Sequence, residues 1–153
     1  KIIFQKTLGR IRIEYQKKLF KNVNVKLRTE AVYVSFVDVI PDETGISGFV
    51  DFSWLPIEII KTGCRFSAFS AESYESAMWQ FEMAMPGYMT TKQLNGDGIR
   101  FFTYLNLEIF HKITLSSRYE ITKKNNVEIL GSGYLEIPGN IDQRLIFQLD
   151  LKI

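Results

Sequence analysis

The sequence has a single cysteine, Cys64, and a single histidine, His111. One cysteine cannot form an internal disulfide, so cysteine usage identifies no redox compartment. A Ser/His/Asp triad or a histidine-based metal site would depend on His111 alone, beside Lys112 in a predicted tight turn. No combination of nucleophile, base and orienting group stands out, and we expect a non-enzymatic protein with no cofactor and no metal.

The chain also lacks a long apolar run and an excess of one charge. No stretch approaches the roughly 18 apolar residues of a membrane helix, but strands of about 9–11 residues can cross a bilayer with a weaker signal. With 19 basic and 17 acidic residues the net charge is +2, which argues against nucleic acid as a partner. The start at Lys1, without Met or a secretory signal, indicates a processed or truncated product.

What the sequence does have is a two-residue alternation of apolar and polar side chains. From residue 10 to residue 16, Ile11, Ile13 and Tyr15 alternate with charged or polar residues. Successive side chains of a strand point to opposite faces, so this alternation predicts half-buried antiparallel strands. Gly, Pro, Asn and Asp between the alternating segments mark the turns.

The alternation predicts about ten strands in one domain, residues 1–153. We expect an all-β, antiparallel up-and-down β-barrel of about ten strands, or the C-terminal part of a larger one. The predicted strands are Ile2–Lys6, Gly9–Lys17, Val23–Phe36, Ser47–Leu55, Cys64–Glu72, Glu75–Met83, Tyr88–Leu94, Ile99–Phe110, Ile113–Ile121 and Gln143–Ile153.

The connections alternate between short and long, which is typical of outer-membrane barrels. The short connections predict tight turns on one rim of the sheet: Phe20–Asn22, Pro56–Ile57, Met85–Gly87 and Phe110–Lys112. The longer ones predict a second rim: Asp38–Gly45, Glu72–Glu75, Asn95–Gly98 and Thr122–Asp142.

Two arrangements satisfy the alternating faces. The apolar side chains can fill the interior of a soluble barrel, or they can face lipid around a polar lumen. In lipid the charged rows must face inward, because Arg or Lys on the lipid side costs about 2–4 kcal/mol at the midplane. The carboxylates of these rows could form a general acid/base pair, but cross-strand ion pairing is the stronger interpretation. The predicted lumen-facing residues are Arg10, Arg12, Glu14, Lys26, Arg28, Glu30, Arg100, Glu108, Arg118 and Glu120.

Aromatic residues are candidates for belts at the membrane interfaces, where an apolar ring meets the headgroups and its polar tip stays hydrated. The alternative is that these rings fill a soluble core. The candidates are Trp54, Trp79, Tyr88, Tyr104 and Tyr119.

The remaining motifs have structural interpretations. Cys64 alternates with apolar neighbours and is expected to be a small apolar wall residue, and the methionines near Trp79 are expected to be flexible apolar filler. Asn95–Gly98 lacks the carboxylate series of a calcium loop and predicts a hairpin turn. Gly131–Gly133 has neither the lysine nor the helix of a phosphate loop, so it also predicts a turn.

Three segments carry a resemblance to a known family: Tyr74–Ser76, Gly96–Phe102 and Ile129–Asn140, the last followed by an alternating final strand. Over roughly Gly9 to Ile153 the chain resembles the C-terminal barrel region of a Bacteroidota outer-membrane family, whose members often carry helix-hairpin-helix repeats upstream. The resemblance implies a β-barrel in the bacterial outer membrane and implies no chemistry.

We therefore expect a non-enzymatic outer-membrane β-barrel protein, acting as a channel-like or scaffold subunit in a larger assembly. Its expected partners are outer-membrane lipids and other outer-membrane or periplasmic proteins. The alternative is a soluble up-and-down barrel that binds an apolar small ligand.

Overall fold

The computed structural model describes residues 6–36, 41–109, 112–131 and 133–151, with the side chains of Met83 and Leu135 left out. Within these residues the fold is all-β, and its one helical element is the 3-10 turn η1 (Gly133–Leu135). The strands are β1 (Lys6–Phe20), β2 (Val23–Phe36), β3 (Glu43–Ile57), β4 (Ile60–Ala71), β5 (Met78–Met85), β6 (Tyr88–Leu94), β7 (Gly96–Ile109), β8 (Ile113–Lys124), β9 (Ile129–Leu130), β10 (Ile137–Pro138) and β11 (Ile141–Leu151).

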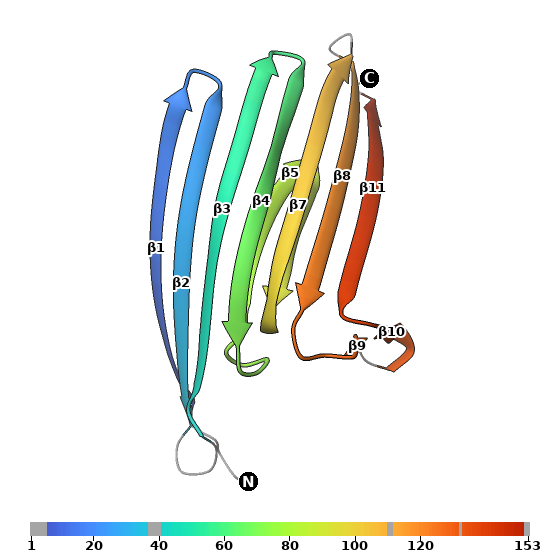
Figure 1. Ribbon diagram of the computed structural model, residues 1–153. Coiled ribbons are helices and arrows are strands. Elements are labelled where there is room, and N and C mark those ends of the chain that lie inside the picture. The colour runs from blue at the N-terminus through green and yellow to red at the C-terminus, as the bar shows by residue number, and fades with distance from the viewer. Residues whose placement is uncertain (1–5, 37–40, 110–111, 132, 152–153) are drawn as a thin grey trace.

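Seven strands form one antiparallel sheet in the order β1-β2-β3-β4-β7-β8-β11, as Figure 1 shows. This confirms the predicted all-β, antiparallel class. The sheet does not close on itself among the described residues, and β1 and β11 are its two edges. The ten-strand count is not reproduced, because β5 and β6 pair only with each other and β4 pairs directly with β7.

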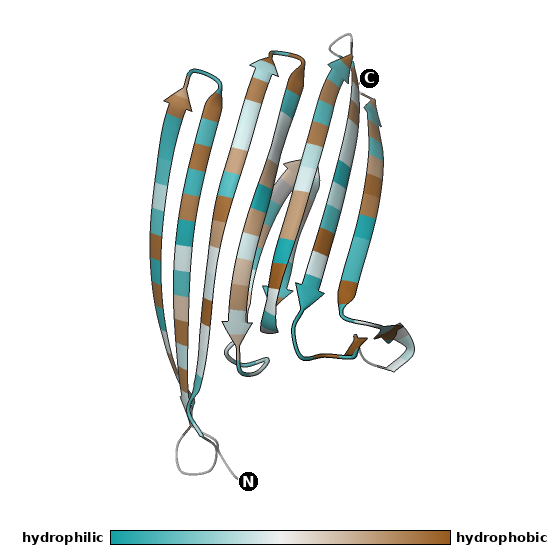
Figure 2. Ribbon diagram, viewed as in Figure 1, coloured by the Kyte–Doolittle hydropathy of each residue, from teal (hydrophilic) through white to brown (hydrophobic). Residues whose placement is uncertain are grey.

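The alternation of the sequence separates the two faces of this sheet. Because paired residues point to the same side, the register aligns like side chains across the strands. Figure 2 shows the resulting alternation of apolar and polar residues along each strand. One row across the sheet is apolar: Tyr15, Leu27, Val50, Phe66, Phe101 and Ile121. We call this side the outer face. The neighbouring row is mostly polar and lies on the opposite side, the inner face: Glu14, Arg28, Phe49, Ser67, Arg100 and Thr122.

Short and long connections lie at opposite ends of the sheet, as predicted, but the predicted turn Pro56–Ile57 is wrong, because both residues belong to β3 and the turn falls at 58–59. Tight turns at 21–22, 58–59 and 86–87 lie toward one end of the strands, and longer connections at 72–77 and 125–140 lie toward the other. The long connection contains β9, η1 and β10. Residues 37–40 and 110–111 of the predicted connections, and residues 1–5 of the predicted first strand, lie outside the described residues.

The β5–β6 hairpin lies against the inner face, where it contacts β3, β4, β7 and β8. Two small apolar clusters anchor it. Toward the long connections, Met78 packs on Val32, Val34 and Ala71. Toward the tight turns a second cluster joins the hairpin to the sheet: Ala84, Met85, Phe102 and Tyr104, with Tyr88 and Ile146 packed against it. The core of the protein is therefore the layer between this hairpin and the sheet.

Gly63 on β4 makes room for the ring of Tyr104 on the adjacent strand. A Cβ at Gly63 would lie 2.8 Å from the Tyr104 hydroxyl oxygen and 2.5 Å from the Phe52 carbonyl oxygen. We expect Gly63→Ala to lower the free energy of unfolding by about 1–3 kcal/mol through overpacking. Urea unfolding measures this, and Gly9→Ala, whose Cβ would meet only the Tyr33 carbonyl oxygen at 4.0 Å, is the matched control. Equal unfolding midpoints for the two variants would contradict the prediction.

Candidate functional site

The ten charged residues predicted to share one side of the sheet all lie on the inner face. They divide into two groups according to whether the hairpin covers them. The uncovered group lies on β1 and β2: Arg10, Arg12, Glu14, Lys26, Arg28 and Glu30. The second group lies on β7 and β8: Arg100, Glu108, Arg118 and Glu120.

The uncovered group forms ion pairs between β1 and β2. Glu30 is buried and accepts from Arg12 Nε at 2.8 Å, with Arg10 Nε 3.3 Å from its other oxygen. Glu14 accepts from Arg28 Nε at 2.7 Å and lies 2.8 Å from Lys26 Nζ. The sequence favours cross-strand ion pairing over an acid/base pair for Glu14 and Glu30, and the structure confirms the ion pairing.

Three residues of this second group, Arg100, Arg118 and Glu120, form a buried ion network centred on Glu82 of β5. Glu108 is only half-buried and lines the cavity at the tight-turn end. Arg100 Nε and Nη2 donate to the two Glu82 carboxylate oxygens at 2.8 and 2.9 Å, and Arg118 Nη2 also donates to Glu82. Glu120 accepts from Arg100 Nη2 at 2.9 Å and from Arg118 Nε at 3.1 Å. Arg100 Nη1 donates to the Thr122 hydroxyl at 2.7 Å. Two guanidinium and two carboxylate groups balance each other in a site whose side chains are at most 7% exposed.

Glu82 is held as an ionised carboxylate inside the fold. Burial by itself raises the pKa of a carboxyl group, but the hydrogen bonds and charges of Arg100 and Arg118 outweigh it and hold the pKa of Glu82 below its ordinary value. The Arg118 guanidinium also lies 4.4 Å from the centre of the Phe102 ring, a favourable cation–π contact. The hairpin is thus attached to the sheet by charge as well as by apolar packing.

Further hydrogen bonds attach the hairpin along its length. Three of them use carbonyl oxygens of the hairpin backbone. Arg65 Nη1 donates to the Phe81 carbonyl at 2.9 Å, Asn106 Nδ2 to the Ala84 carbonyl at 2.8 Å and Gln148 Nε2 to the Pro86 carbonyl at 2.7 Å. A fourth joins side chains, from the Ser67 hydroxyl to Gln80 Oε1 at 3.0 Å. These contacts fix the hairpin in one position on the inner face.

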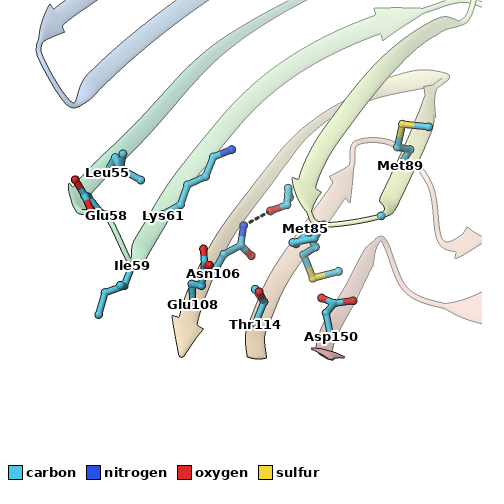
Figure 3. A pocket seen from close by; sticks show the side chains of 13 residues that line it. Leu55, Glu58, Ile59, Lys61, Met85, Met89, Asn106, Glu108, Thr114 and Asp150 are labelled. Carbon is cyan, nitrogen blue, oxygen red and sulfur yellow. Dashed lines mark hydrogen bonds between the residues drawn. The ribbon is translucent and has the colours of Figure 1, made fainter. Parts of the chain in front are cut away.

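A cavity of about 600 Å³ opens at the tight-turn end, beside the tip of the hairpin (Figure 3). Its lining mixes apolar and charged side chains. Leu55, Met85 and Met89 contribute the apolar part, and the charged part comes from Glu58, Lys61, Glu108 and Asp150. The mixed lining favours neither an apolar ligand nor a single ion.

The predicted interfacial aromatics divide between three places. Trp54 and Tyr119 lie on the outer face, as an interfacial belt requires. The prediction is wrong for Tyr104, which is 8% exposed in the inner-face cluster. It is also wrong for Trp79 and Tyr88, because both belong to the hairpin, which is not part of the sheet. Alternation cannot distinguish a strand that packs against the inner face of the sheet from one that pairs within the sheet.

The other candidate residues of the sequence take structural positions. Cys64 is half-buried on the outer face, in line with Phe66 and Ala68. Asn95 connects β6 to β7, which do not pair, so the predicted hairpin turn there is wrong. His111 and Ser132 lie outside the described residues. Within the described part of the chain, no three His, Cys, Asp or Glu side chains group so as to hold a metal ion.

Sequence reasoning missed the residues of the inner layer, above all Glu82, Gln80 and Arg65. The available signal was that residues 77–85 are almost entirely apolar, with Gln80 and Glu82 as the only polar members. A strand with apolar residues on both faces is typically covered on both, and its isolated carboxylate then needs a buried cation.

No protein-family model, curated protein or solved structure matches this chain. None of the described residues forms a helix long and apolar enough to span a bilayer.

Proposed function

We propose that this chain forms part of the wall of a β-barrel in a bacterial outer membrane and acts as a non-enzymatic, channel-like or scaffold subunit. The observation that carries this proposal is the distribution of polarity. Buried ions lie on the inner face, around Glu82, while large apolar side chains stay exposed on the outer face. A protein in lipid places its apolar face outward in this way.

The apolar outer face extends from one edge of the sheet to the other. Soluble monomers rarely expose contiguous apolar patches of more than a few hundred Å². Here the side chains on this face are 42–70% exposed: Ile11, Ile13, Tyr15, Leu27, Ile46, Val50, Phe66, Ile99, Leu105, Leu115, Leu145, Phe147 and Leu149. Acyl chains of lipid are the cover that suits a surface of this extent.

The directions of the edge strands support a larger barrel. Each of the six neighbouring pairs from β1 to β11 is antiparallel, so β1 and β11 run in the same direction. Direct pairing of the two edges would be parallel, whereas outer-membrane barrels are built of antiparallel strands. Antiparallel closure requires an odd number of additional strands, from a longer chain or from a partner protein.

The soluble alternative, a barrel with an apolar ligand inside, receives less support. It requires an apolar interior, and the inner face instead carries two ion-pair networks and only small apolar clusters at the hairpin. The hairpin also occupies the space over β4, β7 and β8 that a ligand would need. The same occupancy favours a scaffold or a narrow passage over a wide pore.

Fractionation followed by gel migration tests the proposal. We expect the full-length protein in the membrane pool, and we expect its unheated band in a detergent gel to migrate differently from its boiled band, because a closed barrel resists unfolding by detergent. A sample unfolded in urea before loading is the control for the boiled position. A monomer that stays soluble without detergent would refute the proposal and favour the ligand-binding barrel.

A further inference from the structure

The part of the inner face that the hairpin leaves uncovered presents positive charge. The side chains of Arg10 and Arg12 are 39% and 42% exposed, whereas Glu30, which they share, is 3% exposed beneath them. Glu14, the other carboxylate of this group, is 34% exposed but is shared between Lys26 and Arg28. Four cationic side chains thus face two carboxylates over β1 and β2. An excess of positive charge on a surface raises the local concentration of anions.

A cavity of about 190 Å³ lies beside this region, where β1–β4 meet β7. Its size is below the roughly 300–1,000 Å³ of pockets for drug-sized molecules, so its occupant is a small group. Apolar surface from Phe52 and Phe102 makes up part of its lining, and the polar part consists mainly of hydrogen-bond donors: Gln16, Asn24, Lys26, Ser53, Lys61, Arg65 and Tyr104. Gly63 allows the Tyr104 hydroxyl to lie over β4, at this cavity.

The one carboxylate of the cavity is already neutralised. Asp51 accepts from Arg65 Nε at 3.0 Å and from Arg65 Nη2 at 2.5 Å, a bidentate pair. Lys26 is shared with Glu14 but retains further N–H groups, because an ammonium has three donors. Lys61 makes no ion pair with a described residue. The charged hydrogen-bond donors that remain available to a ligand in this cavity are therefore the ammonium groups of Lys61 and Lys26.

We infer that this cavity is an anion site that takes the phosphate group of a small solute. Lysine is a frequent phosphate ligand, and the neutral donors of Asn24 and Ser53 suit the remaining oxygens. A lipid headgroup carries the same chemistry, but the cavity opens on the inner face, away from the apolar surface. The occupant is accordingly a free solute, and the inference holds whether or not the outer face meets lipid.

Titration calorimetry of the full chain in an uncharged detergent tests the site, with inorganic phosphate as the probe at low ionic strength. We expect saturable binding, weakened about tenfold by Lys61→Gln, which is the loss of one charged hydrogen bond. Lys26→Gln should weaken it similarly, and Lys61→Arg should retain it. Lys123→Gln, which removes the same charge from an exposed position on the outer face, should leave the affinity unchanged.

The outcomes separate the site from its alternatives. Absence of phosphate binding, or equal affinity in wild type and Lys61→Gln, overturns the inference. An equal loss in Lys123→Gln would show that net charge, not the cavity, attracts phosphate. Binding of phosphatidylglycerol micelles without binding of inorganic phosphate would assign the cavity to a lipid headgroup and reject the free solute. Circular dichroism of each variant shows that the sheet is retained.

Discussion

Val50→Arg is expected to lower the stability of the protein folded into phospholipid vesicles by about 2–4 kcal/mol. Val50 lies near the middle of the outer face, beside Phe66 of the neighbouring strand, and both side chains are about half exposed. An arginine facing lipid at the bilayer midplane costs about 2–4 kcal/mol, a large fraction of the 5–15 kcal/mol typical of a folded protein. Phe66→Arg should act in the same way. Equilibrium refolding from urea in the presence of vesicles measures both losses.

The matched control for this experiment is Gln16→Arg, because Gln16 lies on the inner face of an edge strand and is exposed. It adds the same charge on the side that the proposed membrane orientation turns toward the lumen, and it should change stability little. If the outer face is in water, Val50→Arg should instead stay within about 0.5 kcal/mol of wild type, as surface substitutions usually do. That result would contradict a lipid-facing outer surface.

Glu82→Gln is expected to release the hairpin from the sheet. The change keeps the shape of the side chain and removes its charge, so Arg100 and Arg118 are left with Glu120 as the one carboxylate of the network. Breaking a buried ion pair by removing one partner costs about 3–5 kcal/mol, because a buried charge loses its compensation. Hydrogen exchange should therefore accelerate for the amides of β5 and β6, with smaller changes in β1 and β2.

An exposed carboxylate provides the comparison for that variant. Glu58, in the tight turn between β3 and β4, is exposed and belongs to no buried network, so Glu58→Gln should leave hairpin exchange unchanged. Unaltered protection of β5 and β6 in Glu82→Gln would mean that apolar packing alone holds the hairpin. In that case the two small clusters around Met78 and Met85 would be its main attachment.

The faces of the sheet were predictable from the sequence because alternation is a local property. The alternation predicts a strand at Val23–Phe36 with the bounds that the structure has, and the ten charged residues lie together on one side of the sheet. Strand pairing is not local. Tyr88–Leu94 alternates as a wall strand would, yet it pairs only with β5. The contacts that place this hairpin on the inner face, such as those of Glu82 with Arg100 and Arg118, do not follow from its own alternation.

The same distinction explains which site residues could not be predicted. Alternation places Arg100 on the same face as the other charged residues, as the register shows, but it does not identify the partner Glu82, since nothing near Glu82 in sequence shows which cation it meets. Tyr104 was misplaced for a related reason. Its ring occupies the space that a side chain at Gly63 of the adjacent strand would fill. Gly63 lies opposite Tyr104 only because of the register of β4 against β7.

The point where the chain leaves the sheet has a consequence for how the protein can vary. Ala71, the last residue of β4, and Gly96, the first of β7, are paired neighbours. Residues 72–95 thus depart from and return to adjacent positions, so the seven strands form one continuous meander with the hairpin as an insertion. The length of the insertion can therefore vary independently of the seven-stranded meander. Shortening, extending or excising the insertion would change how much of the inner face is covered, while every strand pair of the meander keeps its alignment.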